Sequence, residues 1–238
     1  LLGVFVWVVA RDRAVAAGEA SAGKATSGVA RWVLVAALLA GLAAFVYEIA
    51  WIRMLSLVLG SSTHAFELML SAFILGLALG GFWIRKRIGT ITDAPRALAG
   101  LFVLMAVLGA LTLPAYGYAF DVMAATLRTF APVESGYAAF NVLSHFIAAV
   151  MMIPTTVVAG MTLPLMTHYL FKAGSGEQAI GKVYAANTVG AIAGVLIAIH
   201  LLLPKLNAQM GAISSIGLLL VLLLTHHILM TQQAVWVE

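Results

Sequence analysis

The sequence predicts an all-α protein that crosses a membrane several times. Of its 238 residues, 63% are hydrophobic and only 9% are charged, whereas a soluble domain carries roughly 25% charged residues. The mean hydropathy is +1.07, and apolar runs of about 20 residues, the length that spans a bilayer as a helix, recur along the chain. Backbone polar groups at membrane depth must be bonded internally, so we expect these spans to be helices rather than strands.

The apolar segments define the expected domain organisation. The stretch 1–10 would rise only about 15 Å as a helix, half a hydrocarbon core, so we interpret it as the end of a truncated transmembrane helix. A cytoplasmic linker at 11–31, a membrane helical domain at 32–231 and a cytoplasmic tail at 232–238 follow. The prediction is a polytopic bundle of six complete transmembrane helices plus part of a seventh at the N-terminus. The six complete spans are expected at 32–58, 64–84, 97–119, 137–158, 182–203 and 209–231.

Basic residues cluster in alternate loops and predict the orientation. The loops of one side hold ten of them and those of the other side hold two, Arg128 and Lys205. The positive-inside rule makes the richer side cytoplasmic and places the C-terminus there. The net charge of +4 therefore indicates topology rather than a nucleic-acid partner, and we expect a bacterial inner (plasma) membrane protein. The ten residues of the richer side are Arg11, Arg13, Lys24, Arg31, Arg85, Lys86, Arg87, Arg96, Lys172 and Lys182.

Small residues recur every four positions in three spans. Such stripes let helix backbones approach closely, although an Ala/Gly-rich chain also produces them by chance. We predict close packing for the second and fifth spans above all. The stripes are Ala36, Ala40 and Ala44; Ala72, Gly76 and Gly80; and Ala186, Gly190, Gly194 and Ala198.

Two charged residues, Glu48 and Arg53, interrupt the first span. Glu48 continues the alanine stripe four residues beyond Ala44, so it should face the protein interior near the middle of the span. A charge at that depth costs at least about 2.5–3.5 kcal/mol, so Glu48 needs either protonation or a partner. Arg53 is displaced by about 140° around the helix and is poorly placed to pair with it.

The short turn at 60–63 should bring the next helix back antiparallel, with His64 and Glu67 in its first turn. Arg53 and Glu67 then lie at similar depth on neighbouring helices. We predict an ion pair between them within salt-bridge reach, with Glu48 deeper in the membrane. This pair either pins two helices together or belongs to a substrate or proton pathway.

The apolar stretch from 137 to 171 is too long for one straight span, since it would extend about 52 Å. Pro154 and Pro164 each remove a backbone donor, so we predict that 151–170 is not one continuous straight helix. Either a discontinuous helix lines a transporter cavity here, or a kinked helix is followed by an interfacial turn.

A polar cluster, Tyr184, Asn187 and Thr188, opens the fifth span. Asn187 lies beside the glycine stripe of that span and is expected to cap or bridge to the broken segment. The single histidines His145 and His200 are expected to be hydrogen-bonded packing residues. The chain has no cysteine and hence neither disulfides nor thiolate metal sites. We expect neither a metal nor a cofactor in it.

Three stretches together resemble one family. Residues 41–83 contain Tyr-Glu-x-x-Trp-x-Arg, then Gly-Ser-Ser, then Leu-Gly-x-x-x-Gly; residues 160–166 read GMTLPLM; and residues 181–204 contain Tyr-x-x-Asn-Thr-x-Gly-x-x-x-Gly and end in Leu-Pro. This combination is similar to the membrane domain of fused spermidine synthase-like proteins, in which a transporter-like domain precedes a soluble spermidine synthase domain. The resemblance covers roughly residues 30–225.

The resemblance implies an aminopropyltransferase-like domain after the membrane helices, but nothing in this sequence matches it, so no catalytic residue is expected here. Two classes of function remain. In the first class, the chain binds or transports a small cationic solute such as a polyamine, or it anchors the cytoplasmic domain. Glu48 and Glu67 then supply negative charge, and Tyr47 and Trp51 supply aromatic faces for the cation. Alternatively, it is a non-catalytic accessory subunit of a larger membrane complex, whose partners are the bilayer and other subunits.

Overall fold

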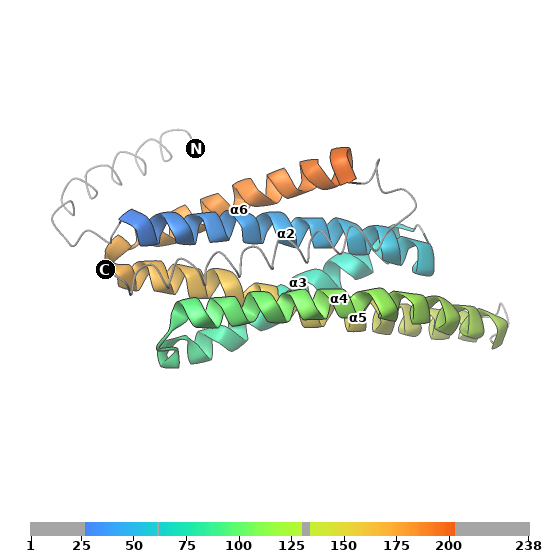
Figure 1. Cartoon of the computed structure of the whole chain (residues 1–238). Coiled ribbons are helices and arrows are strands. Elements are labelled where there is room, and N and C mark those ends of the chain that lie inside the picture. The colour runs from blue at the N-terminus through green and yellow to red at the C-terminus, as the bar shows by residue number, and fades with distance from the viewer. Residues whose placement is uncertain (1–26, 61, 130–133, 203–238) are drawn as a thin grey trace, which may run out of the picture.

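The computed structural model describes residues 27–60, 62–129 and 134–202, and these residues form helices and no strand (Figure 1). Five helices are long and apolar enough to cross a membrane, which confirms the all-helical class. The described residues thus support five membrane-spanning helices, not the predicted six and part of a seventh. The segments 209–231, 1–10 and 232–238 lie outside them. The five helices are α2 (Ser27–Leu59), α3 (Thr63–Arg87), α4 (Ala94–Thr129), α5 (Glu134–Leu170) and α6 (Gln178–Ile197).

Three short segments complete the described chain: η1 (Ile88–Thr90), a 3-10 helix, and the π-helical turns η2 (Phe171–Ser175) and η3 (Ala198–Leu202). Capping side chains fix two of the helix starts. The Ser62 hydroxyl accepts a hydrogen bond from the Ala65 amide at 3.1 Å, and the Asp93 carboxylate accepts one from the Arg96 amide at 3.0 Å. Both satisfy amides that a helix start leaves without an intrahelical partner.

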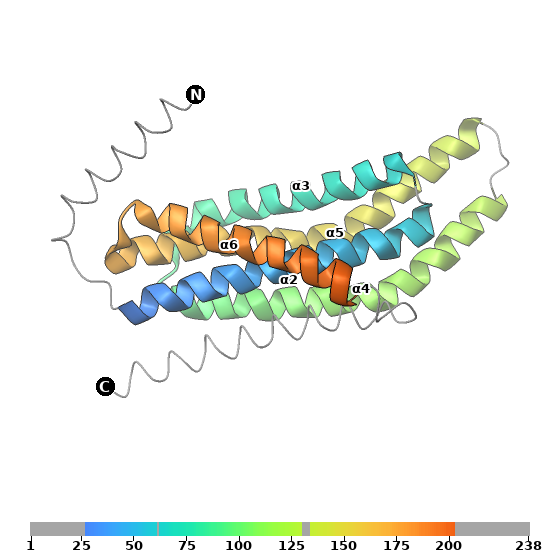
Figure 2. The same cartoon turned by 90° about the horizontal axis from the view of Figure 1, so that it is seen from above.

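The two most extensive helix contacts join helices that are not consecutive in sequence. α2 packs mainly along α6, α3 along α5, and α4 also along α5, whereas α2 and α3 make little contact beyond their connection. Gly190 lies against Leu38 and Gly194 against Leu42, so α2 and α6 run parallel. Figures 1 and 2 show the same direction for both helices of this pair.

The small-residue stripes of the second and fifth predicted spans lie in close helix contacts, as predicted. α2 meets Gly190 and Gly194 through Leu38 and Leu42 and not through its alanine stripe. A Cβ added at Gly190 would meet the Leu38 carbonyl oxygen, and one at Gly80 would meet the Val157 carbonyl oxygen. We call the first contact the α2–α6 seam and the second the α3–α5 seam. Because the atoms in the way belong to the backbone, these positions accept only glycine without a shift of one helix.

Two buried aromatic residues of α2 fill the core between α2 and α4. Tyr47 and Trp51 stack with ring centroids 5.3 Å apart, and both side chains are buried. The Trp51 indole donates a hydrogen bond to the Thr112 hydroxyl at 3.3 Å, and that hydroxyl donates to the Gly109 carbonyl at 2.6 Å. The indole N–H therefore has the partner that a buried tryptophan requires.

The long apolar stretch forms one unbroken helix that is not straight (Figure 2). α5 continues through both Pro154 and Pro164 to Leu170, and Figure 2 shows it curving along its length. Neighbouring helices allow prolines inside membrane helices, and α5 packs against both α3 and α4. The turn follows at η2, where Gly174 adopts φ 91°. Of the two alternatives, the kinked helix with a terminal turn describes this region.

Candidate functional site

Glu48 lies half-buried on α2, and its Oε2 atom is buried without a hydrogen-bond partner among the described residues. Two helical turns earlier on the same face, Gly41 contacts Asn187 of α6. Glu48 therefore continues the flank of α2 that borders the α2–α6 seam. This placement agrees with the predicted inward face.

Tyr47 and Trp51 do not share this flank. Only 2% of Tyr47 and 1% of Trp51 are exposed, and the two rings face each other in the α2–α4 core. The expectation that both rings offer open faces to a cation beside Glu48 is therefore wrong. The two aromatic residues of the Tyr-Glu-x-x-Trp motif instead pack inside the core.

The predicted Arg53–Glu67 ion pair does not form. Both side chains are exposed, and the ion pair found within residues 27–60, 62–129 and 134–202 joins Arg96 to Asp93 at 3.1 Å. After the turn α3 departs from α2 and packs along α5, so similar depth in the membrane does not bring the two side chains together. The His64 side chain lies outside the described residues.

A double-mutant cycle tests this separation. We expect Arg53→Gln and Glu67→Gln to change the free energy of unfolding additively, with a coupling energy below about 0.3–0.5 kcal/mol, because independent sites behave in this way. The measurement is detergent unfolding of the two single variants and the double variant. A coupling of 1 kcal/mol or more, which is an order-of-magnitude threshold for contacting residues, would contradict the observed geometry.

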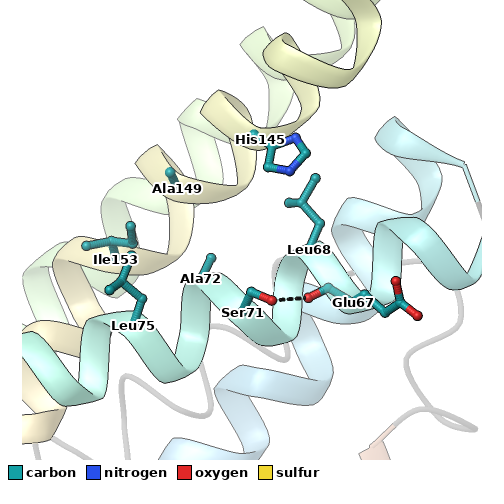
Figure 3. Close-up of a pocket in the computed structure, with 8 residues that line it drawn as sticks. All are labelled: Glu67, Leu68, Ser71, Ala72, Leu75, His145, Ala149 and Ile153. Atoms are coloured by element: carbon teal, nitrogen blue, oxygen red, sulfur yellow. Dashed lines mark hydrogen bonds between the residues drawn. The ribbon is translucent and has the colours of Figure 1, made fainter. Parts of the chain in front are cut away.

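Glu67 instead borders an open groove of about 390 Å³ between α3 and α5. The Ser71 hydroxyl donates to the Glu67 carbonyl at 2.7 Å, and Figure 3 shows the Glu67 carboxylate directed away from the neighbouring helix, whereas His145 lies across from Leu68. Glu48 does not line this groove, so the two acidic residues do not share it. The lining residues are Glu67, Leu68, Ser71, Ala72, Leu75, His145, Ala149 and Ile153.

The polar residues at the start of α6 point in different directions. The Asn187 amide donates to the Ala37 carbonyl at 3.2 Å, so it bridges to α2 and not, as predicted, to the segment around Pro154 and Pro164. Tyr184 and Thr188 are exposed. Tyr184 and Thr188 thus lie outside the α2–α6 seam, in which Asn187 takes part.

The two histidines singled out in the sequence, His145 and His200, contact their own helices. His145 Nδ1 lies 2.7 Å from the Asn141 carbonyl oxygen, and His200 Nδ1 lies 3.1 Å from the Leu196 carbonyl oxygen. These bonds match the predicted hydrogen-bonded role, although both side chains are exposed rather than packed. In the part of the chain that the structure describes, no group of three or more His, Asp or Glu residues could hold a metal ion.

The residues that carry the family resemblance can now be located. No family model, curated protein or solved structure matches the chain. The resemblance to spermidine synthase-like proteins thus depends on the motifs, and several of their residues lie in helix contacts: Gly76 and Gly80 in the α3–α5 seam, and Gly190 and Gly194 in the α2–α6 seam.

Sequence reasoning missed the partners of the buried aromatic residues. Thr112 and Gly109 of α4 contact Trp51 and Tyr47, but neither was a candidate. The available signal was a hydroxyl three residues after a glycine within an apolar helix, a spacing that places both on one face.

Proposed function

We propose that the chain is the membrane domain of a spermidine synthase-like protein of the bacterial inner membrane, with its C-terminus cytoplasmic, and that Glu48 binds a small cationic solute such as a polyamine. The observation that carries this proposal is the buried Oε2 atom of Glu48, which has no hydrogen-bond partner among the described residues. The alternating loop charges support the orientation.

A carboxylate in this position favours a cationic ligand for a physical reason. Removing its charge from water is costly unless a partner compensates, and the described basic side chains do not supply one. The ammonium group of a polyamine carries three donors and a positive charge, as lysine does. It therefore supplies both the hydrogen bond and the countercharge that Oε2 lacks.

A specific observation also favours a second candidate, a structural subunit of a larger membrane complex. Tyr47 and Trp51 lie in a closed core, and motif glycines lie in the two seams. In that role the closely packed bundle serves assembly, and Glu48 is a protonated packing residue.

Spermidine binding to the purified chain distinguishes the two candidates. We expect Glu48→Gln to weaken spermidine binding by at least about tenfold, since hydrogen bonds to charged groups contribute roughly 1.5–3 kcal/mol. Glutamine keeps the shape of the side chain, so the melting temperature should change little. The measurement is calorimetric titration in detergent, accompanied by a thermal melt.

Glu67→Gln is the matched control, because it makes the same change at an exposed acidic residue on the neighbouring helix in sequence. We expect it to bind spermidine as the unchanged chain does. Equal binding by Glu48→Gln and the unchanged chain, or no binding by either, would reject the solute site and favour the structural subunit.

A further inference from the structure

One end of the bundle carries most of its positive charge. The starts of α2, α4 and α6 and the ends of α3 and α5 lie together there (Figures 1 and 2). Within residues 27–60, 62–129 and 134–202, this end carries seven basic side chains, all exposed, and two acidic residues, Asp93 and Glu177. The basic residues, which together define the basic end, are Arg31, Arg85, Lys86, Arg87, Arg96, Lys172 and Lys182.

The opposite end of the described bundle is nearly balanced. It carries Arg53 and Arg128 together with Glu67 and Asp121, all of them exposed, and α5 begins there at Glu134. Among the described residues the basic end has a formal excess of five positive charges, whereas the five charged residues of the opposite end sum to −1. The asymmetry therefore belongs to the folded bundle and not only to the overall composition.

Exposed aromatic side chains accompany the basic residues. Trp83 is 47% exposed, and the Arg87 guanidinium lies over its ring, 4.7 Å from the centroid. Such a cation–π contact holds the guanidinium beside an apolar surface. Aromatic residues in this pattern mark the level of the membrane–water interface. The exposed aromatic residues next to basic ones are Trp32, Phe82, Trp83, Phe171 and Tyr184.

We propose that the basic end binds the headgroups of anionic phospholipids. The aromatic rings lie at the level of the glycerol groups, and the arginine and lysine side chains reach the phosphodiesters above them. A soluble acidic protein or a nucleic acid would also suit the charge, but these rings stand at the ends of membrane-spanning helices, where lipid surrounds them. A lipid accounts for both, and phosphatidylglycerol, which has no cationic group of its own, fits the excess charge.

The test compares lipid retention by the purified chain. The protein in detergent is incubated with equal amounts of phosphatidylglycerol and phosphatidylcholine of the same acyl chains, and the bound lipids are counted by native mass spectrometry. We expect phosphatidylglycerol to be enriched. Arg85→Gln/Arg87→Gln should reduce that enrichment by at least about tenfold, since each basic residue near the headgroups contributes roughly fivefold.

Arg53→Gln/Arg128→Gln is the matched control, because it removes two exposed arginines from the opposite, nearly balanced end. It should retain the enrichment. Lys172→Gln/Lys182→Gln provides a second variant of the basic end if the first fails to fold, and it should also lose enrichment. Size-exclusion profiles and melting temperatures show that each variant is folded.

Five outcomes would overturn the proposal. Three concern the lipid itself: equal binding of the two lipids by the unchanged chain, undiminished enrichment in a folded variant of the basic end, and equal loss in the control. The fourth is displacement of the lipid by millimolar glycerol 3-phosphate, which would identify a site for soluble phosphate compounds. Displacement by a short nucleic acid or an acidic peptide at equimolar concentration would likewise assign the surface to a soluble macromolecule.

Discussion

Trp51→Ala is expected to lower the free energy of unfolding by about 3–5 kcal/mol, the usual cost of truncating a buried tryptophan. Only 1% of this side chain is exposed. The substitution removes its stacking with Tyr47 and leaves the Thr112 hydroxyl without the indole donor. Lipid does not fill an enclosed core, so the lost contacts are not replaced. Thermal melting and denaturant titration in a single detergent measure the change.

Trp83→Ala is the control, since it deletes the same side chain from an exposed position on α3. It loses the contact with Arg87, and we expect a cost of only about 0.5–1 kcal/mol. Equal losses for the two variants would mean that Trp51 is not enclosed as the structure shows. Trp51→Phe should fall between them, because it keeps a ring but not the donor.

Gly190→Ala is expected to destabilise the bundle by about 1–3 kcal/mol, the range for inserting a methyl group into a packed interface. The new Cβ would meet the Leu38 carbonyl oxygen across the α2–α6 seam. A backbone atom cannot rotate away as a side chain does, so α6 must move from α2 as a unit. The expected observation is a lower melting temperature.

Gly181→Ala is the matched control in the same helix, because a Cβ there has nothing within 4 Å. Alanine has the higher helix propensity by up to about 1 kcal/mol, so this variant should be as stable as the unchanged chain or slightly more stable. If both alanine variants shifted equally in either direction, the close α2–α6 contact would be refuted.

Local patterns in the sequence predicted much of the bundle. Hydropathy located the five described helices. The four-residue spacing of Gly76 and Gly80 in α3, and of Gly190 and Gly194 in α6, predicted close packing at the two seams. Both signals are properties of single helices. They identify which face packs, but not which other helix packs against it.

Predictions from the sequence failed where they depended on which helix packs against which. Arg53 and Glu67 were paired because their helices are consecutive, but α3 packs along α5. The unbroken course of α5 through Pro154 and Pro164 also depends on packed neighbours, which the sequence does not identify. The half-buried position of Glu48 depends on the face of its own helix, and the residue pattern of that helix pointed to it. Whether Glu48 binds a solute could not follow from either pattern.

The pairing of α2 with α6 also has a consequence in time. Asn187 and Ala37, which are hydrogen-bonded across this seam, are 150 positions apart in sequence. At a synthesis rate of roughly 5–20 residues per second, about 8–30 s separate the emergence of the two residues from the ribosome. During that interval α2 must wait in the bilayer with its seam-facing backbone and Glu48 uncovered by α6. The nascent helix therefore passes through a stage that the finished bundle does not display, in which lipid or the insertion machinery must cover this surface.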